Sequence, residues 1–548
     1  MTEEYTEKNK AEEIIKRLQR LESERQNYAN FWQDVAKYVI PRKAFITTEK
    51  TPGQKYPYDV YDSTAMQANM VLAAGLHSYL TNPNSRWFSL RLSDKELSEN
   101  ADVREWLSDT EERMYNQLNS SNFNQQIHEL YLDLGTFGVA CMYEEEDEVE
   151  GIRFYSRDIA EIFLCENEKE KVDTVYRKFK MTARQAYEKW GDAAGEVVKN
   201  FMEKKDFDRQ VEFVHCVEPR YQRDVNKQDA LNMPFESTYI EKSKKHLIAQ
   251  SGYRDFPYFT PRFNKNSGDV WGSSPAMVLY SDIKMLNEMV KIMIRSAQKQ
   301  VDPPLVLPHD GFLLPIKYGP TDLNFRLRGT ADDKIEPLVT GANISIGLEV
   351  ISQWQQTVKK GYFVDLFLLL ADPARKDMTA TEVMQRVEEK MLILAPVLGR
   401  LMNEFLDPLL QRTFNIMWRK GQLLPPPSVI QSLPYTIEYI SPLARAQKLD
   451  QMKSINSFLA LIGQVSTVKP DVLDNVNEDE VVNDIQQLYG VNPKFVRDKA
   501  EVKAIREARA EAIAKQQQLL TAQQGVETLK TGAEAAATLK PKESNAGK

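Results

Sequence analysis

Apolar and polar positions alternate most regularly in the last third of the chain. Apolar residues recur there at steps of three and four, which places them on one helical stripe. They are Val383, Val387, Met391, Leu394, Leu398, Leu401, Phe405 and Leu409. Thr379 and Glu382 have the spacing of a capping box at its start, and Gly421 ends it. The pattern predicts a helix of about 40 residues and about 60 Å, with bends at Pro396 and Pro408.

Two shorter amphipathic segments precede this helix and flank a region rich in glycine and proline. The first is predicted over Pro275–Gln300, where Ser274 suits the N-cap and Pro275 the first helical position. Its apolar side covers more than half of the circumference, so it needs partners on two sides. The remaining strip carries Lys284, Lys291, Arg295 and Lys299, with Glu288 among them. The second segment is predicted over Ser345–Leu370.

The N-terminal half begins with helices and continues with short strand patterns. Helices are expected near Glu12–Val39, from Ser63 as N-cap to Leu80, and over Val103–Leu118 and Gln125–Leu134, with a partly alternating strand at Trp87–Leu92. Seven β-like runs follow: Val139–Tyr143, Ile152–Tyr155, Glu161–Leu164, Thr174–Phe179, Glu212–Val217, Ser237–Ile240 and Lys245–Ala249. A helical pair near Ala183–Trp190 and Ala194–Met202 interrupts them. This order predicts an α+β region of meander type within a mixed, predominantly α-helical chain.

The C-terminal part is predicted to be mostly helical. A strand at Tyr435–Ile440 precedes helices ending near Ile462, over Glu480–Tyr489 and over Phe495–Leu520. The last residues, from Lys540, have the composition of a disordered tail.

Composition narrows the class of protein. The chain has 548 residues, enough for two to four domains, 42% hydrophobic residues and a net charge of −8, so as a whole it does not attract nucleic acid. Its three cysteines are widely spaced, which indicates a reduced environment without a disulfide framework. The N-terminus lacks the apolar stretch of a secretory signal, and the strongest apolar run, Tyr362–Ala371, is half the length of a membrane span.

No catalytic, cofactor or metal site can be read from the sequence. The five histidines share no zinc-binding spacing, and the hydrolase, dinucleotide and P-loop signatures are missing. The acidic run Glu144–Glu148 is the one carboxylate cluster. A metal site needs carboxylates converging from separate elements, so we interpret this run as a solvated hairpin turn.

The basic strip of the first amphipathic helix leaves two interpretations open. Its spacing of seven, four and four suits a surface that faces phosphates, but such a strip is also the ordinary solvated face of an amphipathic helix. Arg375 and Lys376, beside Asp372 and Asp377, are equally ambiguous.

The order of these elements resembles that of the portal, or head-to-tail connector, proteins of short-tailed bacteriophages. The resemblance rests on Tyr61–Ala65, Asn82-Pro83 with Trp87-Phe88, Trp271–Pro275 with Asp282–Lys284 and Leu286-Asn287, Pro303–Leu305, and Met378–Val383. It extends to about residue 445, and the remainder matches by type only.

The resemblance implies a fold with wing, stem, clip and crown or barrel, assembled as a ring. It assigns residues 1–270 to the wing, 271–302 and 342–371 to the stem helices, 303–341 to the clip and 372–378 to a tunnel loop. Residues 379–440 would form the long kinked wing helix and following strand, and 441–548 the crown or C-terminal barrel. Arg375, Lys376 and Asp377 would face the DNA channel, as would Lys284, Lys291, Arg295 and Lys299 of the stem, and Arg326, Arg328 and Lys334 would serve clip contacts.

The resemblance also implies a non-enzymatic role and a set of partners. We expect a homo-oligomeric ring of twelve copies at one capsid vertex of the virion, assembled in the host cytoplasm, without a membrane and without cofactors. Its partners would be double-stranded DNA passing without sequence specificity, the major capsid and scaffolding proteins, the terminase large subunit, and the tail adaptor and tail proteins. The alternatives are a metal-dependent nucleic-acid enzyme and another structural capsid or scaffold protein.

Overall fold

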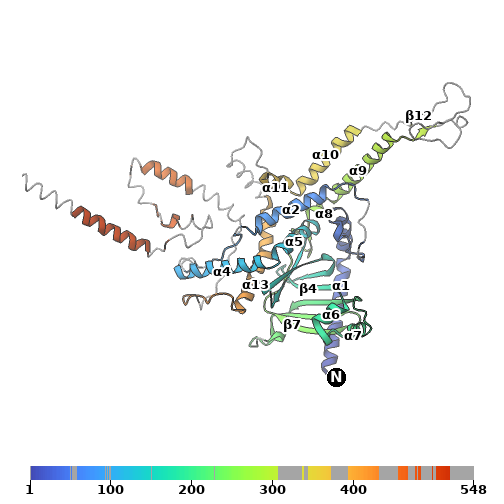
Figure 1. Ribbon diagram of the computed structural model, residues 1–548, viewed down its shortest axis with the longest axis horizontal. Coiled ribbons are helices and arrows are strands. Elements are labelled where there is room, and N and C mark those ends of the chain that lie inside the picture. Colours follow the sequence, from blue (N-terminus) through green and yellow to red (C-terminus); the bar gives the residue numbers. More distant parts are fainter. Residues whose placement is uncertain are drawn as a thin grey trace, which may run out of the picture. The chain divides into compact units, whose positions relative to one another are not determined.

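A computed structural model describes residues 2–49, 59–84, 86–92, 100–149, 151–227, 229–306, 336–337, 344–371, 393–430, 455–466, 479–482 and 501–518, with a few isolated positions (Figure 1). The chain divides into two compact units. The first comprises Met1–Arg91, Thr110–Leu424 and Ile437–Ala444, and the second Leu92–Asp109, Pro425–Thr436 and Arg445–Lys548. The chain is of mixed α and β structure, as predicted.

A five-stranded antiparallel sheet lies in the first unit, in the order β3-β4-β5-β6-β7. Its strands are β3 (Ile162–Glu166), β4 (Val172–Thr182), β5 (Gln210–Pro219), β6 (Phe235–Glu241) and β7 (His246–Tyr253). Residues of α1 (Thr2–Val39) such as Leu18 pack with Val214 and Ile240 on one face. Residues of α6 (Ala183–Trp190) and α7 (Glu196–Glu203), Ala186 and Val198 among them, pack with Phe213 on the other. Helices therefore cover both faces.

A second, three-stranded sheet has the order β2-β1-β8, with β1 (Cys141–Asp147), β2 (Gly151–Arg157) and β8 (Tyr258–Phe259). Trp32 packs in one core cluster with Cys141 and Tyr258 of this sheet. It is completely buried and donates its indole N–H to Phe137 O of α5 (Phe123–Phe137) at 3.1 Å. All seven predicted strands and the helical pair α6 and α7 are confirmed. The short strands β8, β9 (Asn264–Lys265) and β10 (Gly272–Ser273) were not predicted.

The predicted strand at Trp87–Leu92 is wrong. The segment forms no β-ladder, because side chains of α4 (Ala101–Ser120) take the place of a partner strand. Phe88 N donates to Tyr115 Oη at 2.5 Å, Tyr115 Oη donates to Phe88 O at 2.7 Å, and Leu90 N donates to Glu111 at 2.6 Å. Side chains thus form hydrogen bonds with backbone N–H and C=O groups of this extended segment, which in a sheet would pair with a neighbouring strand.

The sheets are followed in the first unit by α8 (Pro275–Val278), α9 (Tyr280–Val301), α10 (Ile344–Gly361) and α11 (Val364–Ala371), of which α10 and α11 contact α2 (Thr64–Leu80). The two predicted amphipathic helices are each interrupted once, at Leu279 and at Tyr362-Phe363. Phe363 has a φ of 59°, a left-handed conformation that ends a helix. The predicted bounds of α2 are confirmed, but Ser63 makes no capping bond, and Asp62 Oδ1 accepts from Thr64 N at 2.9 Å instead.

The predicted long helix is confirmed where it is described. Residues 393–401 are α-helical, Met402–Leu406 form a π-helical segment, and α13 continues over Asp407–Arg419. Asp407 N donates to Met402 O, five residues back, directly before Pro408. The irregularity expected at Pro408 is therefore a π segment. It accommodates the proline ring, whose nitrogen has no hydrogen to donate to the helix. Residues 379–392 lie outside the described residues, and with them the capping box.

In the second unit, residues 455–466 and 501–518 are helical, which agrees with two of the predicted C-terminal helices. Arg506 forms an ion pair with Asp479 at 2.7 Å. The strand expected at Tyr435–Ile440 lies outside the described residues.

Candidate functional site

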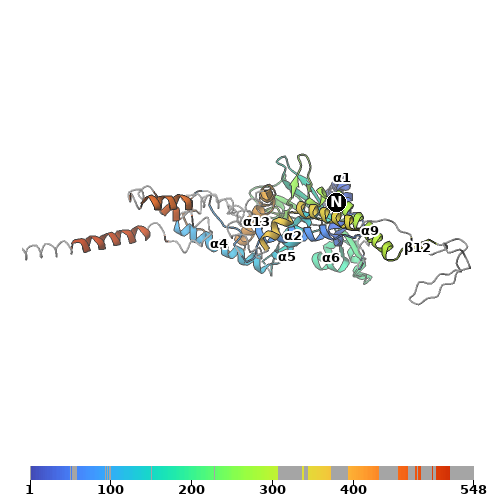
Figure 2. The same cartoon turned by 90° about the horizontal axis from the view of Figure 1, so that it is seen from above.

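A helical arm is formed by α9 and α10, which lie side by side and run in opposite directions (Figures 1 and 2). Its start is fixed as predicted: Ser274 Oγ accepts from Met277 N at 3.0 Å and donates to Thr136 O at 2.7 Å, with Pro275 in the first turn. A Cβ on Gly347 would lie 1.8 Å from Met293 Cε, so glycine allows the helices to approach. At the far end β11 (Leu305–Val306) pairs antiparallel with β12 (Glu336–Pro337).

The four predicted basic residues of α9 share one face of the arm. At about 100° per residue they fall within an arc of about 80°, and Met293, which meets α10, lies about 180° from Lys284. The basic face therefore points away from α10. Lys284, Arg295 and Lys299 are exposed. Lys291 is half-buried and pairs with Glu288 at 3.0 Å.

Residues 59–63, which we call the strap, cross one edge of the arm. Asn287 of α9 is 2% exposed; its Oδ1 accepts from Tyr61 N at 2.6 Å and from Asp62 N at 3.3 Å, and its Nδ2 donates to Asp59 O at 2.9 Å. Gln355 of α10 donates to Asp62 Oδ2 at 2.9 Å. The strap is thus fastened to both helices of the arm by buried or half-buried amides.

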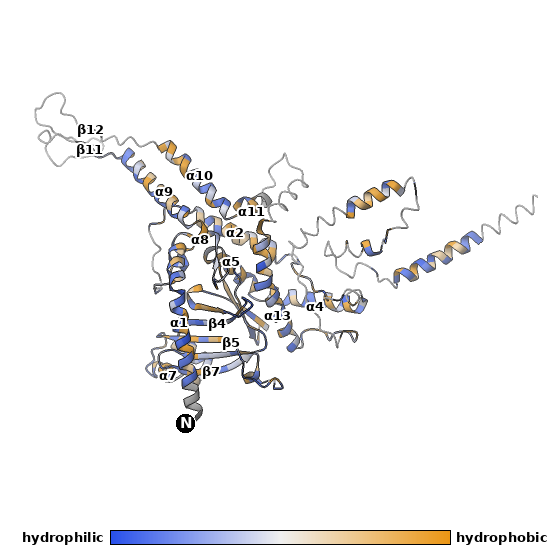
Figure 3. Cartoon of the chain, turned by 180° about the vertical axis from the view of Figure 1, so that it is seen from behind, coloured by the Kyte–Doolittle hydropathy of each residue, from blue (hydrophilic) through white to orange (hydrophobic). Residues whose placement is uncertain are grey.

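Large apolar side chains are exposed along the arm, whose hydrophobic positions are orange in the cartoon of Figure 3. Exposed fractions are 39% for Met285, 60% for Ile292, 41% for Ile294, 59% for Ile346 and 55% for Leu348. Exposed apolar patches are typical of surfaces that bind another protein.

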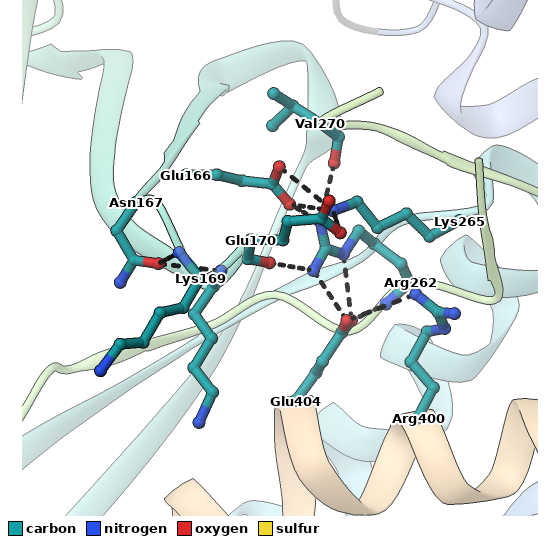
Figure 4. A network of polar contacts seen from close by, with 10 residues as sticks. Glu166, Asn167, Lys169, Glu170, Arg262, Lys265, Val270, Arg400 and Glu404 are labelled. Atoms are coloured by element: carbon teal, nitrogen blue, oxygen red, sulfur yellow. Dashed lines mark hydrogen bonds and ion pairs between the residues drawn. The ribbon is translucent and has the colours of Figure 1, made fainter. Parts of the chain in front are cut away.

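A polar junction joins three segments that are distant in sequence (Figure 4). Arg262 is 2% exposed and donates to both carboxylate oxygens of Glu404, at 3.1 Å from Nε and 2.7 Å from Nη2. It also contacts Glu166 at the end of β3, while Lys265 pairs with Glu166 at 3.0 Å and with Glu170 at 2.6 Å. The hydrogen bond from Lys265 lowers the pKa of Glu170. Because Glu404 lies in the π segment, the junction ties that segment to the sheet and to the approach to the arm.

The predicted solvated turn at Glu144–Glu148 is wrong for most of its length. Glu144–Asp147 belong to β1, and Glu144 is completely buried against α13. Its Oε1 accepts from Thr413 Oγ1 at 3.0 Å, and its Oε2 lies 3.7 Å from Arg412 Nε. Burial raises the pKa of Glu144 from 4.5 to about 8. Glu146 instead pairs with Arg419 at 2.6 Å. Strand alternation places Glu144 and Glu146 on the same face of β1, where α13 supplies the partners of both carboxylates.

The structure does not describe two groups of the predicted site residues. They are Arg375, Lys376 and Asp377 of the predicted tunnel loop, and Arg326, Arg328 and Lys334 of the predicted clip. Within the described ranges, no three side chains of His, Cys, Asp or Glu gather as metal ligands would. No helix in those ranges is both apolar enough and long enough to span a bilayer.

Sequence reasoning assigned no contact to Asn287, which entered only as part of the family resemblance, or to Arg262 and Arg412. The sequence gives only a weak indication that Asn287 binds another segment: it is a polar amide between Leu286 and Glu288, at the border of the apolar face of the helix. The two arginines gave none, because the partners Glu404 and Glu144 are 142 and 268 residues away.

Comparison with known proteins gives consistent matches over nearly the whole chain. A family described as "Bacteriophage head to tail connecting protein" matches residues 11–496. A protein named "Portal protein" from Salmonella phage epsilon15 is 33% identical over 526 residues, covering 95% of each chain. A "Probable portal protein" from Bordetella phage BPP-1 is 31% identical over 520 residues, covering 94% of each.

Proposed function

The chain belongs to the bacteriophage head-to-tail connecting protein family and acts as a connector of the portal type; from this premise we propose that identical copies close into a ring whose helical arms surround double-stranded DNA. The observation that carries the proposal is the arm itself. Its two helices pack on each other and still leave Ile292 and Ile346 about 60% exposed. Burial of apolar surface stabilises by about 25 cal/mol per Å², so contacts between arms favour assembly.

A ring of identical subunits requires contacts between two different surfaces of each copy. The arm offers apolar side chains on two edges, because Ile292 and Ile294 lie about 80° to either side of Lys284 on the helix. In this proposal the arms are the stem of the portal fold, residues 303–341 are the clip, and 372–378 are the tunnel loop. The ring has twelve copies.

The basic face lies between those two edges, and in the proposal it faces the DNA. Lys284, Arg295 and Lys299 would contact phosphates without reading bases. Twelve copies at −8 would carry −96 in total, so the ring as a whole repels DNA and the basic face acts only locally. That balance suits passage, because a tightly held duplex would not slide.

The remaining parts of the proposal concern partners. A connector at a capsid vertex meets the major capsid and scaffolding proteins on one side and the terminase large subunit, then tail adaptor and tail proteins, on the other. Assembly would take place in the host cytoplasm, and the role is structural rather than catalytic.

Native mass measurement and particle imaging of the purified chain test the ring. We expect a closed oligomer with an axial hole; single copies at high concentration, or a multimer that is solid along its axis, would refute it. The matched variants are Ile292→Asp with Ile346→Asp on the arm, and Val225→Asp with Leu231→Asp on the β5–β6 loop, where the wild-type side chains are 74% and 55% exposed. Only the arm variant should lose assembly.

The DNA-facing role is tested on assembled rings. Arg295→Gln with Lys299→Gln should leave the ring intact and reduce the salt dependence of DNA binding, by about 0.9 in log–log slope for each phosphate that the variant no longer neutralises. The control is Lys204→Gln with Lys205→Gln, two exposed lysines after α7. Equal slopes for the two variants would place the basic face away from DNA.

A further inference from the structure

We propose that neighbouring copies pack the open edge of one arm against the strap of the next. This inference rests on the proposed ring and adds which two surfaces meet. The open edge consists of Met285, Ile292 and Ile346. The strap edge consists of the strap with the arm side chains above it, Ile294 and Leu348.

The two edges are assigned from helix geometry and the strap contacts. Asn287, which binds the strap, lies about 60° to one side of Lys284, and Ile294 lies about 80° to that side. Ile292 and Met285 lie about 80° and 100° to the other side. On α10, Leu348 precedes strap-bound Gln355 by two turns and so shares its face. Ile346 lies about 180° from Gln355.

The open edge consists of apolar side chains that are exposed in a single copy. Ile292 and Ile346 are 60% and 59% exposed, and Met285 is 39% exposed. These three side chains lie on the edge of each helix that the strap leaves uncovered, and none carries a charge. A partner for this edge must therefore offer apolar or aromatic surface.

The strap edge offers such a surface in a fixed conformation. Tyr61 is 38% exposed, and its backbone is held by the buried amide of Asn287. Lys291 Nζ lies 5.8 Å from the Tyr61 ring centroid and is neutralised by Glu288 at 3.0 Å. The aromatic side chain of Tyr61 is thus presented without a net charge beside it. Docking of a neighbour does not require the strap to become ordered.

We assign a second copy of this chain as the partner, because the open edge and the strap edge lie at the same level along the axis of the arm. Met285 and Ile292 lie on either side of Asn287 along α9, at a rise of about 1.5 Å per residue. Copies related by rotation about an axis roughly along the arm would bring the open edge of one to the strap of the next, and each copy would use each edge once. This is the heterologous contact that closes a ring.

The test is cysteine cross-linking in the full-length chain. The double variant Tyr61→Cys with Ile292→Cys should give, on mild oxidation, a ladder of covalent multimers, because every copy carries both halves of a neighbour-to-neighbour bond. Each single variant should give no ladder. Tyr61→Cys with Val225→Cys is the matched double control. Tyr61 and Ile292 are both exposed, so folding should be preserved. Of the native cysteines, Cys141 and Cys216 are buried and Cys165 is half-buried, and the single variants control for Cys165.

The outcomes separate this inference from the proposed ring. A ladder from the first double variant alone supports it. The pairing of edges is wrong if the ring is intact but no ladder forms, either with Tyr61→Cys and Ile292→Cys or with Tyr61→Cys and Met285→Cys. That result would not contradict the ring itself. A wild-type chain that forms no ring overturns the proposed function itself. As a second measurement, Tyr61→Lys and Ile292→Glu should each weaken assembly and together restore it; failure to restore would also count against the pairing.

Discussion

Ile292 on the helical arm is 60% exposed, whereas Ile240 in the five-stranded sheet is completely buried, although both lie in regular secondary structure. The contrast extends to polar groups. We call the two sheets and the helices α1, α6, α7 and α13 that cover them the body. In the body, Arg262 and Arg412 are buried among carboxylates and carbonyls. On the arm, Arg295 and Lys299 are exposed and have no ion pair within the described residues.

The two regions therefore obtain their packing partners in different ways. The body supplies its own partners, because α1, α6, α7 and α13 cover its strands and bring in the opposite charges. The arm has one partner helix and one strap, which leaves apolar edges uncovered. We infer that the body folds within a single copy and that the arm depends on assembly for the rest of its stability.

The largest expected effect comes from placing the same substitution in both regions. Ile240→Asp should destabilise the body by more than about 4 kcal/mol, since a charge enters a filled core without a partner. Ile292→Asp should change the unfolding free energy of a single copy by no more than about 0.5 kcal/mol while reducing assembly. Thermal unfolding under conditions where native mass shows single copies measures both. Comparable losses of unfolding free energy in the two variants would show that the arm and the sheet do not differ in this way.

The polar junction should show the next largest effect. Arg262→Ala leaves Glu404 and Glu166 without their shared partner and should cost about 3–5 kcal/mol. Arg262→Lys keeps the charge but loses the two-pronged contact with Glu404, so its cost should be smaller. Denaturant unfolding followed by circular dichroism gives both values. If alanine and lysine behave alike, the charge of Arg262 is not what holds the junction.

The sequence predicted the local parts of this structure and missed the distant ones. The seven strands and the cap of α8 were accessible because their signals lie within a few neighbouring residues, as with Ser274 and Pro275. The junction was not accessible, because nothing near Arg262 indicates that Glu404 will reach it. The segment after Trp87 was misread because its alternation is real, but Tyr115 and Glu111 satisfy its backbone in place of a strand.

The basic face lies between these cases. Periodicity alone placed Lys284, Lys291, Arg295 and Lys299 on one side of a helix, and the structure agrees. It could not show that Glu288 neutralises Lys291, or that the face points away from α10, because both facts depend on how side chains and helices pack.

Buried Glu144 predicts a pH dependence that the arm does not share. Its pKa in the folded chain is raised to about 8 by burial, above the 4.5 of the free side chain. The folded state therefore holds this proton more tightly, so its stabilising effect is complete below pH 4.5 and is lost as the pH rises to about 8. The slope should approach about 1.4 kcal/mol per pH unit.

Glu144→Gln removes the titrating group while preserving its shape, so the stability of the body should become flatter over that pH range. Glu146→Gln is the control, because Glu146 pairs with Arg419 near the surface. Unfolding midpoints measured from pH 5 to pH 8 decide the matter. An unchanged slope in Glu144→Gln would assign the pH dependence to another group.

The smallest expected effect compares two serines that precede helices. Ser274 and Ser63 both suit an N-cap by sequence, but only Ser274 makes the bond, accepting from Met277 N at 3.0 Å and donating to Thr136 O at 2.7 Å. Ser274→Ala should therefore cost about 1 kcal/mol. Ser63→Ala should be nearly neutral, because Asp62 already accepts from the first turn of α2. Since Ser274 also joins the start of the arm to α5, its loss should lower the melting temperature of a single copy and loosen the arm, and hydrogen exchange over residues 275–283 would report that. Equal effects of the two alanines would mean that the hydroxyl of Ser274 does not fix where the arm begins.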